Sequence, residues 1–583
     1  MFLEKVNGPR DVQKLNTDEL KILAEEVRQA LIFKLSHAGG HAGSNLGVVE
    51  LTVALHHVFD SPNDKIIWDV SHQCYPHKIL TGRKNAYLNP DEFGQVTGFT
   101  NPEESEHDLF TVGHTATSVS LALGMAKARD LCGGKEFVVA IIGDGALSGG
   151  EAYEALNYAG EYHKNIIIIL NDNNQSIGEN HGGLYKKLKE LRDSNGTSSD
   201  NFFKGLNLDY RYLEDGHNID QLVELFKEAK KIDHPIVLHI HTQKGKGFKY
   251  SEEFIEEWHS VGPFNVSDGQ PKSGKPNYDM TIHDSIMDLF QRDDKAILLT
   301  AATPRAMGFV GQERAELIES GRIIDVGIAE ENAMAISSGI AKYGTTAVFG
   351  AYGTFLQRTY DQLIHDVCLN NSPATILVFM PGAYGMKSNT HFSMCDIQMF
   401  SHVPNMIYLS PAYKEEYLAM FEYATAQKEH PIAIRVPNRF YLCGEEDKTD
   451  YGKMNKAKVM TYGEDVAIIA VGALIPKAME IFEACENKYG KKITVINPIY
   501  LTGVDNELLD ELKKNHKLVI TMEDGILDGG YGQSIASYYG NSDMKVITLG
   551  ISKEFHSNFD TEKLLSENGI SVEQILNTIS NLF

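Results

Sequence analysis

The chain has 583 residues and a formal net charge of −25. Its length predicts several domains, because a single hydrophobic core rarely serves more than about 300 residues. Hydrophobic residues make up 42% and charged residues 23% of the chain, which is typical of a soluble globular protein. The negative charge argues against binding to nucleic acid or to an anionic membrane, although a local group of basic side chains can still bind a phosphorylated small molecule.

The cysteines and the N-terminus indicate a cytoplasmic protein. Six cysteines are scattered along the chain without a CxxC spacing. This predicts reduced thiols, not a disulfide framework or a zinc site. The first residues, Met1–Lys5, lack the apolar core of a signal peptide. No apolar run approaches the ~18 residues of a membrane span.

Short apolar runs alternate with helical patterns along the chain. The first clear strand is predicted at 136–142, followed by an amphipathic helix over 149–162 and a second strand at 166–170. Strands that are apolar on both faces are typical of parallel sheets covered by helices. The pattern predicts an α/β fold that binds its ligands at the carboxyl ends of the strands.

Two polar stretches divide the chain. Residues 262–277 are rich in Gly, Pro, Ser and Asn, and residues 444–455 are charged and polar. Both compositions are typical of linkers. The sequence therefore predicts three consecutive α/β domains with mostly parallel sheets, over residues 1–270, 278–442 and 456–583.

Polar motifs follow the two predicted strands. Gly143-Asp144-Gly145 closes the first strand, and Asn171-Asp172-Asn173 closes the second. A glycine turn lets backbone N–H groups approach a diphosphate, and the side-chain oxygens of Asp144 and Asn173 are ligands that Mg²⁺ prefers. Each motif alone is more often an ordinary turn. Together they predict a Mg²⁺–diphosphate site, and no GxGxxG motif supports a Rossmann alternative.

Several longer segments resemble the 1-deoxy-D-xylulose-5-phosphate synthases and, more loosely, the transketolases. The matching segments are Gly39–Gly47 (GGHAGSNLG), Trp68–Lys78 (WDVSHQCYPHK, like the family's WDxGHQxYPHK), Gly113-His114-Thr115, and Thr354–Gln362 (TFLQRTYDQ, like TFLQRxYDQ). The resemblance covers essentially the whole chain. It implies a transketolase-like, thiamine diphosphate-binding fold with a diphosphate domain, a pyrimidine domain and a C-terminal transketolase-type domain, in that order.

The resemblance also implies the residues that bind thiamine diphosphate and Mg²⁺. The implied metal ligands are Asp144, Asn173 and the backbone of Gln175. The implied cofactor contacts are His72, Gly113, His114, Thr115, Gly145, Ala146, Asn173, Phe248, Glu330 and Phe355.

Glu330 follows an apolar run over 322–329 that is predicted to form a buried strand. A carboxyl group at the cofactor's pyrimidine ring assists proton removal, and an apolar environment raises the pKa of such a group. An acid at this place could also be an ordinary first residue of a helix. The resemblance favours the catalytic role, and it places His41, His259 and His391 in the same site with polar or proton-transfer roles.

The acceptor end of the implied site departs from the family's pattern. Met380 stands where the family commonly has an arginine, Lys387 where it has an acid, and Asn438 where it has a second arginine. Because arginines are the expected clamp for a phosphate group, these changes put the acceptor in question. The predicted substrate contacts are Tyr352, Arg358, Lys387, His391 and Arg439.

The sequence thus predicts a transferase that uses thiamine diphosphate and Mg²⁺. It would condense pyruvate with glyceraldehyde 3-phosphate, an aldose phosphate, release CO₂ and form 1-deoxy-D-xylulose 5-phosphate for isoprene or thiamine biosynthesis. The family also implies a homodimer. Two alternatives stay open: a transketolase-like transfer with another donor or acceptor, and a cofactor-binding paralogue that no longer catalyses.

Overall fold

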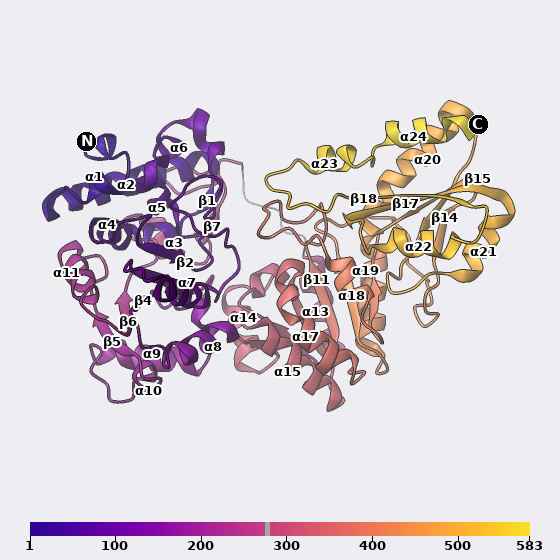
Figure 1. Cartoon of the computed structure of the whole chain (residues 1–583). Coiled ribbons are helices and arrows are strands. Elements are labelled where there is room, and N and C mark those ends of the chain that lie inside the picture. Colours follow the sequence, from indigo (N-terminus) through magenta and orange to yellow (C-terminus); the bar gives the residue numbers. More distant parts are fainter. Residues whose placement is uncertain (274–279, 583) are drawn as a thin grey trace. The chain divides into compact units, whose positions relative to one another are not determined.

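The computed structural model describes residues 1–273 and 280–582. The chain forms two compact units. The first consists of Met1–Asn277 with Gly327–Ala329, and the second of Tyr278–Val326 with Glu330–Phe583. In Figure 1 most of the first unit is indigo to magenta and the second runs on to yellow. No described helix combines the length and the apolar character needed to cross a membrane.

The first unit contains a five-stranded parallel sheet in the order β2-β3-β4-β6-β5. Its strands are β2 (Lys65–Trp68), β3 (Val138–Gly143), β4 (Ile166–Asp172), β5 (Asp209–Leu213) and β6 (Pro235–His241). The two predicted strands are confirmed as β3 and β4. The predicted helix between them is confirmed as α8 (Gly150–Ala159) and is shorter than expected, because Gly160 ends it.

Helices cover both faces of this sheet (Figure 1). Alternate residues of a strand enter opposite cores, so that Val139 and Ile141 pack with α2, α4 and α11, whereas Ala140 and Ile142 pack with α7, α8 and α9. These helices are α2 (Thr17–Ala38), α4 (Val49–Val58), α7 (Ser118–Cys132), α9 (Gly183–Asp193) and α11 (Ile219–Ala229). Burial on both faces explains why the strands are apolar throughout.

The second unit contains two sheets. The six-stranded sheet is parallel, in the order β12-β13-β11-β10-β8-β9. Its strands are β8 (Ile297–Thr300), β9 (Ile323–Asp325), β10 (Ala347–Tyr352), β11 (Thr375–Phe379), β12 (Ile407–Leu409) and β13 (Ile432–Val436). The five-stranded sheet has the order β14-β16-β15-β17-β18, in which β14 pairs antiparallel with β16. Its strands are β14 (Lys458–Thr461), β15 (Asp465–Ala470), β16 (Thr494–Asn497), β17 (His516–Ile526) and β18 (Lys545–Ile551).

The two sheets of the second unit share one hydrophobic core. Phe349 and Ile376 of the six-stranded sheet belong to the same buried cluster as Ile469 and Val519 of the five-stranded sheet. The outer faces have separate cores beneath their own helices. The principal helices of this unit are α13 (Thr281–Arg292), α15 (Glu330–Lys342), α19 (Lys414–Ala426), α20 (Ile475–Tyr489), α22 (Tyr531–Tyr539) and α24 (Val572–Ile579).

Each of the two predicted linkers contains one buried aromatic residue in its described part. Phe264 is buried and pairs with Pro271 in a short bridge. Tyr451 is also buried, and its carbonyl accepts a hydrogen bond from the Tyr500 hydroxyl at 2.5 Å. Single aromatic anchors thus hold these polar stretches, which composition alone does not reveal. Residues 274–277 and the predicted domain start at 278 lie outside the described residues, and the division into three domains stays a prediction.

Candidate active site

The predicted metal ligands lie at the carboxyl ends of β3 and β4. Asp144 is buried, and its Oδ2 accepts a hydrogen bond from Asn180 Nδ2 at 2.7 Å. The Oδ1 of Asn173 is also buried and has no hydrogen-bond partner among the described residues. An unpaired buried amide oxygen is rare in proteins, and beside a carboxylate it fits the oxygen ligands of Mg²⁺. The residues present therefore fit a magnesium ion.

Asp172 immediately precedes Asn173 in the chain but has other partners. Its Oδ2 lies 2.8 Å from His239 Nε2 and also forms an ion pair with Arg192. Burial favours the neutral form, but His239 and Arg192 outweigh it and lower the pKa of Asp172 to about 2. For Asp144, burial and the charge of Asp172 raise the pKa well above its usual range. A cation beside Asp144 would offset that cost.

Three histidines predicted for the site meet in the first unit. The short antiparallel pair of β1 (Gly40–His41) and β7 (Ser260–Val261) brings His41 next to His259. The ring centroids lie 5.2 Å apart for His41 and His72, 5.5 Å for His41 and His259, and 5.3 Å for His72 and His259. The pKa of His259 is well below the usual range because protein encloses the ring and because Lys244, His72 and His41 surround it. His259 is therefore a neutral ring at pH 7.

Two side chains that the sequence analysis did not single out position these segments. Asn45 Nδ2 donates to the carbonyls of His41 (2.7 Å) and His72 (2.8 Å), and so ties the two histidine loops together. Asp69 accepts the N–H groups of Ala116 (2.8 Å) and Ser118 (2.9 Å). This carboxylate fixes the start of α7 and the preceding turn, Gly113-His114-Thr115, where the helix dipole also favours an anion.

Ser71 holds the same turn from the other side. Its hydroxyl donates to the carbonyl of Val112 at 2.7 Å and accepts the N–H of Thr100 at 2.9 Å. The residue is fully buried and has a left-handed backbone with φ +61°. Glycine adopts this conformation without strain, which explains why a family motif can have Gly here. In this chain Ser71 adopts the strained left-handed conformation, and its hydroxyl forms two hydrogen bonds.

We expect Ser71→Ala to destabilise the first unit by about 2 kcal/mol, because a buried N–H and a buried carbonyl lose their partner while the backbone strain stays. Ser71→Gly should cost less, since glycine relieves the strain. Thermal unfolding of the two variants measures the difference. Equal losses in both would contradict the assignment of strain to this position.

Phe248, predicted to contact the cofactor, is buried in an aromatic group. Its ring lies 5.0 Å from that of Trp258 and 5.6 Å from that of Phe264. The rings of the group hold the segment that follows β6 against the segment that carries His259. Gly145 and Ala146 lie at the turn after β3, where the backbone of Ser176 packs closely on Gly145.

In the second unit, Glu330 is the first residue of α15. The expected strand over 322–329 is only partly correct: β9 ends at Asp325. Glu330 is 3% exposed, and its Oε2 has no hydrogen-bond partner in the described part of the chain. Burial raises the pKa of Glu330 to about 7, against the opposing effects of its own backbone N–H and of Arg358. The carboxyl group can thus both release and accept a proton near neutral pH.

Aromatic side chains of the second unit form a row that leads to His391. The ring of Phe355 lies 5.6 Å from that of Tyr352 and 5.6 Å from that of His391. The Nδ1 of His391 lies 2.8 Å from Thr390 Oγ1. Burial lowers the pKa of His391 to about 4, so the ring is neutral at pH 7. The structure therefore brings Tyr352, Phe355 and His391 together.

The basic residues predicted for the acceptor end differ in their surroundings. Lys387 and Arg439 are exposed, and the guanidinium of Arg439 lies over the ring of Tyr441 at 5.5 Å. Met380 is half-buried and has a left-handed backbone with φ +49°. Arg358 is half-buried, and its charge reaches Glu330. Of the predicted cations, Arg358 is thus the one tied electrostatically to the candidate catalytic group.

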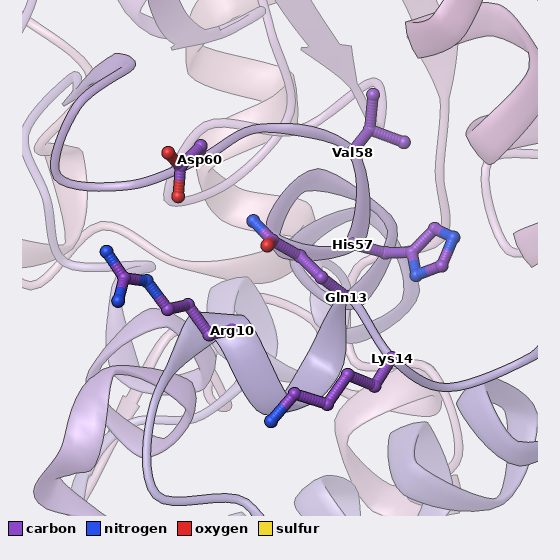
Figure 2. Close-up of a pocket in the computed structure, with 6 residues that line it drawn as sticks. All are labelled: Arg10, Gln13, Lys14, His57, Val58 and Asp60. Atoms are coloured by element: carbon purple, nitrogen blue, oxygen red, sulfur yellow. The ribbon is translucent and has the colours of Figure 1, made fainter.

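A surface pocket of about 610 Å³ lies elsewhere in the first unit. Figure 2 shows its lining residues, which are Arg10, Gln13, Lys14, His57, Val58 and Asp60. The pocket is at the C-terminal end of α4, about 12–14 Å along the helix from Val49, where α4 begins after the Gly39–Gly47 segment. Lys14 pairs with Asp11 at 2.9 Å, and none of the predicted site residues lines the pocket.

Comparisons with known proteins identify the families to which these domains are similar. The N-terminal part matches a family model described as 1-deoxy-D-xylulose-5-phosphate synthase over residues 3–200 and 194–242. Models of the transketolase pyrimidine binding domain and of the transketolase C-terminal domain match residues 275–442 and 455–575. The sheets and helices described above therefore belong to transketolase-type α/β domains with mostly parallel sheets.

Relatives with similar sequences extend over nearly the whole chain. The 1-deoxy-D-xylulose-5-phosphate synthase of Caldanaerobacter subterraneus subsp. tengcongensis is 37% identical, over 99% of this chain and 98% of that protein. The synthase of Carboxydothermus hydrogenoformans is 37% identical, over 98% of both chains. Among solved structures, a transketolase from Campylobacter jejuni subsp. jejuni is 17% identical, with a TM-score of 0.44, over 97% of this chain and 100% of that chain.

Proposed function

The chain belongs to the 1-deoxy-D-xylulose-5-phosphate synthase family, and from this membership we propose its reaction and the residues that perform it. The chain condenses pyruvate with glyceraldehyde 3-phosphate, releases CO₂ and forms 1-deoxy-D-xylulose 5-phosphate. When bound, thiamine diphosphate supplies the carbon nucleophile that attacks the keto carbon of pyruvate and the electron sink that lets CO₂ leave. The protein supplies binding, orientation and proton transfer.

The observation that carries this proposal is the state of Glu330. Burying a carboxyl group that has a pKa of about 7 and no partner for Oε2 lowers the stability of the folded protein. Such a group is typical of a ligand-binding or catalytic site. Glu330 would hold a proton at Oε2 against a ring nitrogen of the pyrimidine, and would exchange this proton during the cycle. Phe355 would stack on the same ring.

Residues of the first unit would bind the diphosphate and its metal. Asp144, the unpaired Oδ1 of Asn173 and the backbone of Gln175 would hold Mg²⁺. The remaining proposed cofactor contacts are His72, Gly113, His114, Thr115, Gly145, Ala146 and Phe248. His41, His259 and His391 would act on substrate oxygens. The last two rings are neutral at pH 7, so each can accept a proton at one ring nitrogen and donate a hydrogen bond from the other.

For the substrates, Arg358 would bind a carboxylate or phosphate beside Glu330, with Tyr352 and His391 as further contacts. Lys387 and Arg439 would reach an acceptor phosphate only from exposed positions. This observation favours one alternative, a transketolase-like reaction with another acceptor aldehyde. Both reactions use the same cofactor residues, so the product distinguishes them.

The test is to identify the product. The purified protein is incubated with thiamine diphosphate, Mg²⁺, labelled pyruvate and glyceraldehyde 3-phosphate, and CO₂ and sugar phosphates are measured. We expect CO₂ and 1-deoxy-D-xylulose 5-phosphate in equal amounts. Release of CO₂ without this product would indicate another acceptor aldehyde. No turnover of pyruvate, with activity on a ketose phosphate, would establish the transketolase-like alternative, and no turnover of either would indicate a paralogue that only binds the cofactor.

The proposal includes a homodimer in the cytoplasm. Two exposed apolar side chains support the dimer: Tyr343 after α15 and Leu369 after η7 (Leu363–Cys368) are 90% and 71% exposed, and the two elements contact each other. The free thiols of Cys132, Cys395 and Cys443 are exposed, as suits a reducing compartment.

A further inference from the structure

Lys244 is a buried cation close to the proposed metal site. It lies in the turn after β6 and is 3% exposed. Its Nζ donates to the carbonyl of Ser176 and, at 3.3 Å, to that of Ile177. Its charge also reaches the carboxylate of Asp144. The side chain therefore connects the turn after β6 with the loop after β4.

The loop that Lys244 contacts carries two of the proposed metal ligands. This loop, residues 173–180, begins with Asn173 and contains Gln175, which pairs with Glu179 to form a tight turn. Its far end is tied to Asp144 by Asn180. Its middle lies on the turn after β3: a Cβ atom added to Gly145 would be 2.7 Å from Ser176 Cβ. Lys244 therefore binds the part of the loop between the ligands and Asn180.

The hydrocarbon part of the Lys244 side chain packs closely against Gly43. A Cβ atom added to Gly43 would be 3.2 Å from Lys244 Cγ and 3.2 Å from the carbonyl oxygen of Trp258. The N–H of Gly43 donates to that carbonyl at 2.8 Å. Lys244 thus joins the loop of the metal ligands to the glycine-rich segment next to His41, and Gly43 of that segment is bonded to the segment that carries His259.

A buried lysine ammonium can hold a loop by donating to backbone carbonyls. This arrangement costs free energy, because the charged group is removed from water. Binding of an anion next to the loop would offset this cost, since the ammonium would add positive charge near the diphosphate. Removing a residue that holds the ligands of a metal ion in place typically lowers metal affinity 10- to 100-fold.

We propose that Lys244 is a positioning residue that holds loop 173–180 in its metal-binding conformation before the cofactor arrives, and so sets the affinity for Mg²⁺ and thiamine diphosphate. This inference rests on the proposed function for the identity of the ligand. The immobilised loop itself is a property of the apoprotein and can be measured without any cofactor.

The test compares Lys244→Met, Lys244→Arg and the wild type. In the apoprotein, we expect amide hydrogen exchange in residues 173–180 to become at least about tenfold faster in Lys244→Met. The apparent Kd for Mg²⁺, titrated at saturating thiamine diphosphate and followed by the fluorescence of Trp258 and Trp68, should rise about 10- to 100-fold. Lys244→Arg, which keeps the cation, should show smaller effects. At saturating Mg²⁺, kcat should return to within about threefold of the wild type, with an unchanged KM for pyruvate.

The matched control is Lys246→Met, two residues along the same turn, whose Nζ bonds only weakly to Gln243 at 3.4 Å. It should change neither exchange nor Mg²⁺ affinity. If Lys244→Met fails to fold, Gly43→Ala takes its place. Its added methyl group reduces the space for the Lys244 side chain and should make amide exchange in residues 173–180 faster. A folded Lys244→Met with unchanged loop exchange and unchanged Mg²⁺ affinity would overturn the inference. If the wild type itself bound no Mg²⁺, the proposed function would fail, and the exchange measurement would still decide whether Lys244 holds the loop.

Discussion

A Glu330→Gln variant is expected to lose about a thousandfold in kcat/KM, within the hundred- to ten-thousandfold range of general acid–base groups. Glutamine keeps the size of the side chain and its place at the start of α15. It cannot release or accept a proton at the position of Oε2. The loss should therefore fall on kcat, while the affinity for Mg²⁺, whose proposed ligands all lie in the first unit, changes little.

The same variant should be more stable at pH 8. Burial raises the pKa of Glu330 to about 7, whereas an exposed glutamate has a pKa near 4.5. A group whose pKa is raised by folding contributes full stability below its unfolded pKa and loses that contribution as the pH rises through the folded value. Between pH 4.5 and pH 7 the wild type thus loses up to about 3 kcal/mol through this residue. Glutamine has no such loss.

Steady-state kinetics and thermal unfolding at pH 5.5 and pH 8 would measure both effects. The wild type also contains Glu523, whose pKa burial likewise raises to about 7, so only the difference between variant and wild type reports on Glu330. Glu331→Gln is the matched control, because the two acids are neighbours in the first turn of α15. A Glu330→Gln enzyme with wild-type kcat would remove the central group from the proposed mechanism.

Local pattern was enough to predict which polar side chains follow the ends of the two strands. Asp144 and Asn173 follow β3 and β4 directly, and parallel neighbouring strands must bring their carboxyl ends to one edge of the sheet. The histidine residues His41, His72 and His259 could be placed only through the family resemblance, since the β1–β7 pair that brings His41 next to His259 has only two residues in each strand.

Long-range polar contacts could not be predicted in this way. Lys244 reaches a loop 68 residues earlier in the chain, and nothing in its own turn distinguishes it from Lys246. The run before Glu330 is apolar enough for a strand, yet β9 ends at Asp325, because apolar composition does not separate a strand from a buried loop. The role of Arg435 depends on two aspartates from other elements, 39 and 89 residues away.

Arg435→Met is expected to destabilise the second unit by about 3–5 kcal/mol. Arg435 is buried in β13, between the two sheets of this unit. Its Nε donates to Asp396 at 2.7 Å, and its Nη1 donates to Asp524 of β17 at 2.7 Å. Methionine has a similar volume but no charge, so both carboxylates would be left buried without their cation. Neutralising the acids as well, in an Asp396→Asn/Arg435→Met/Asp524→Asn variant, should recover part of the loss.

The Arg435→Met variant also tests whether the segment around Arg435 binds the substrate phosphate. The family resemblance led us to expect a phosphate clamp in this segment. Both of the closest partners of the Arg435 guanidinium, however, are aspartates of the protein itself. Arg439→Met is the matched control, because this exposed arginine lies in the same segment over Tyr441 and should change stability by less than about 0.5 kcal/mol. Urea unfolding of both variants and the KM for glyceraldehyde 3-phosphate separate the roles. If Arg435→Met kept its stability and raised that KM, Arg435 would be a substrate ligand; a raised KM in Arg439→Met alone would place the clamp at the exposed residue.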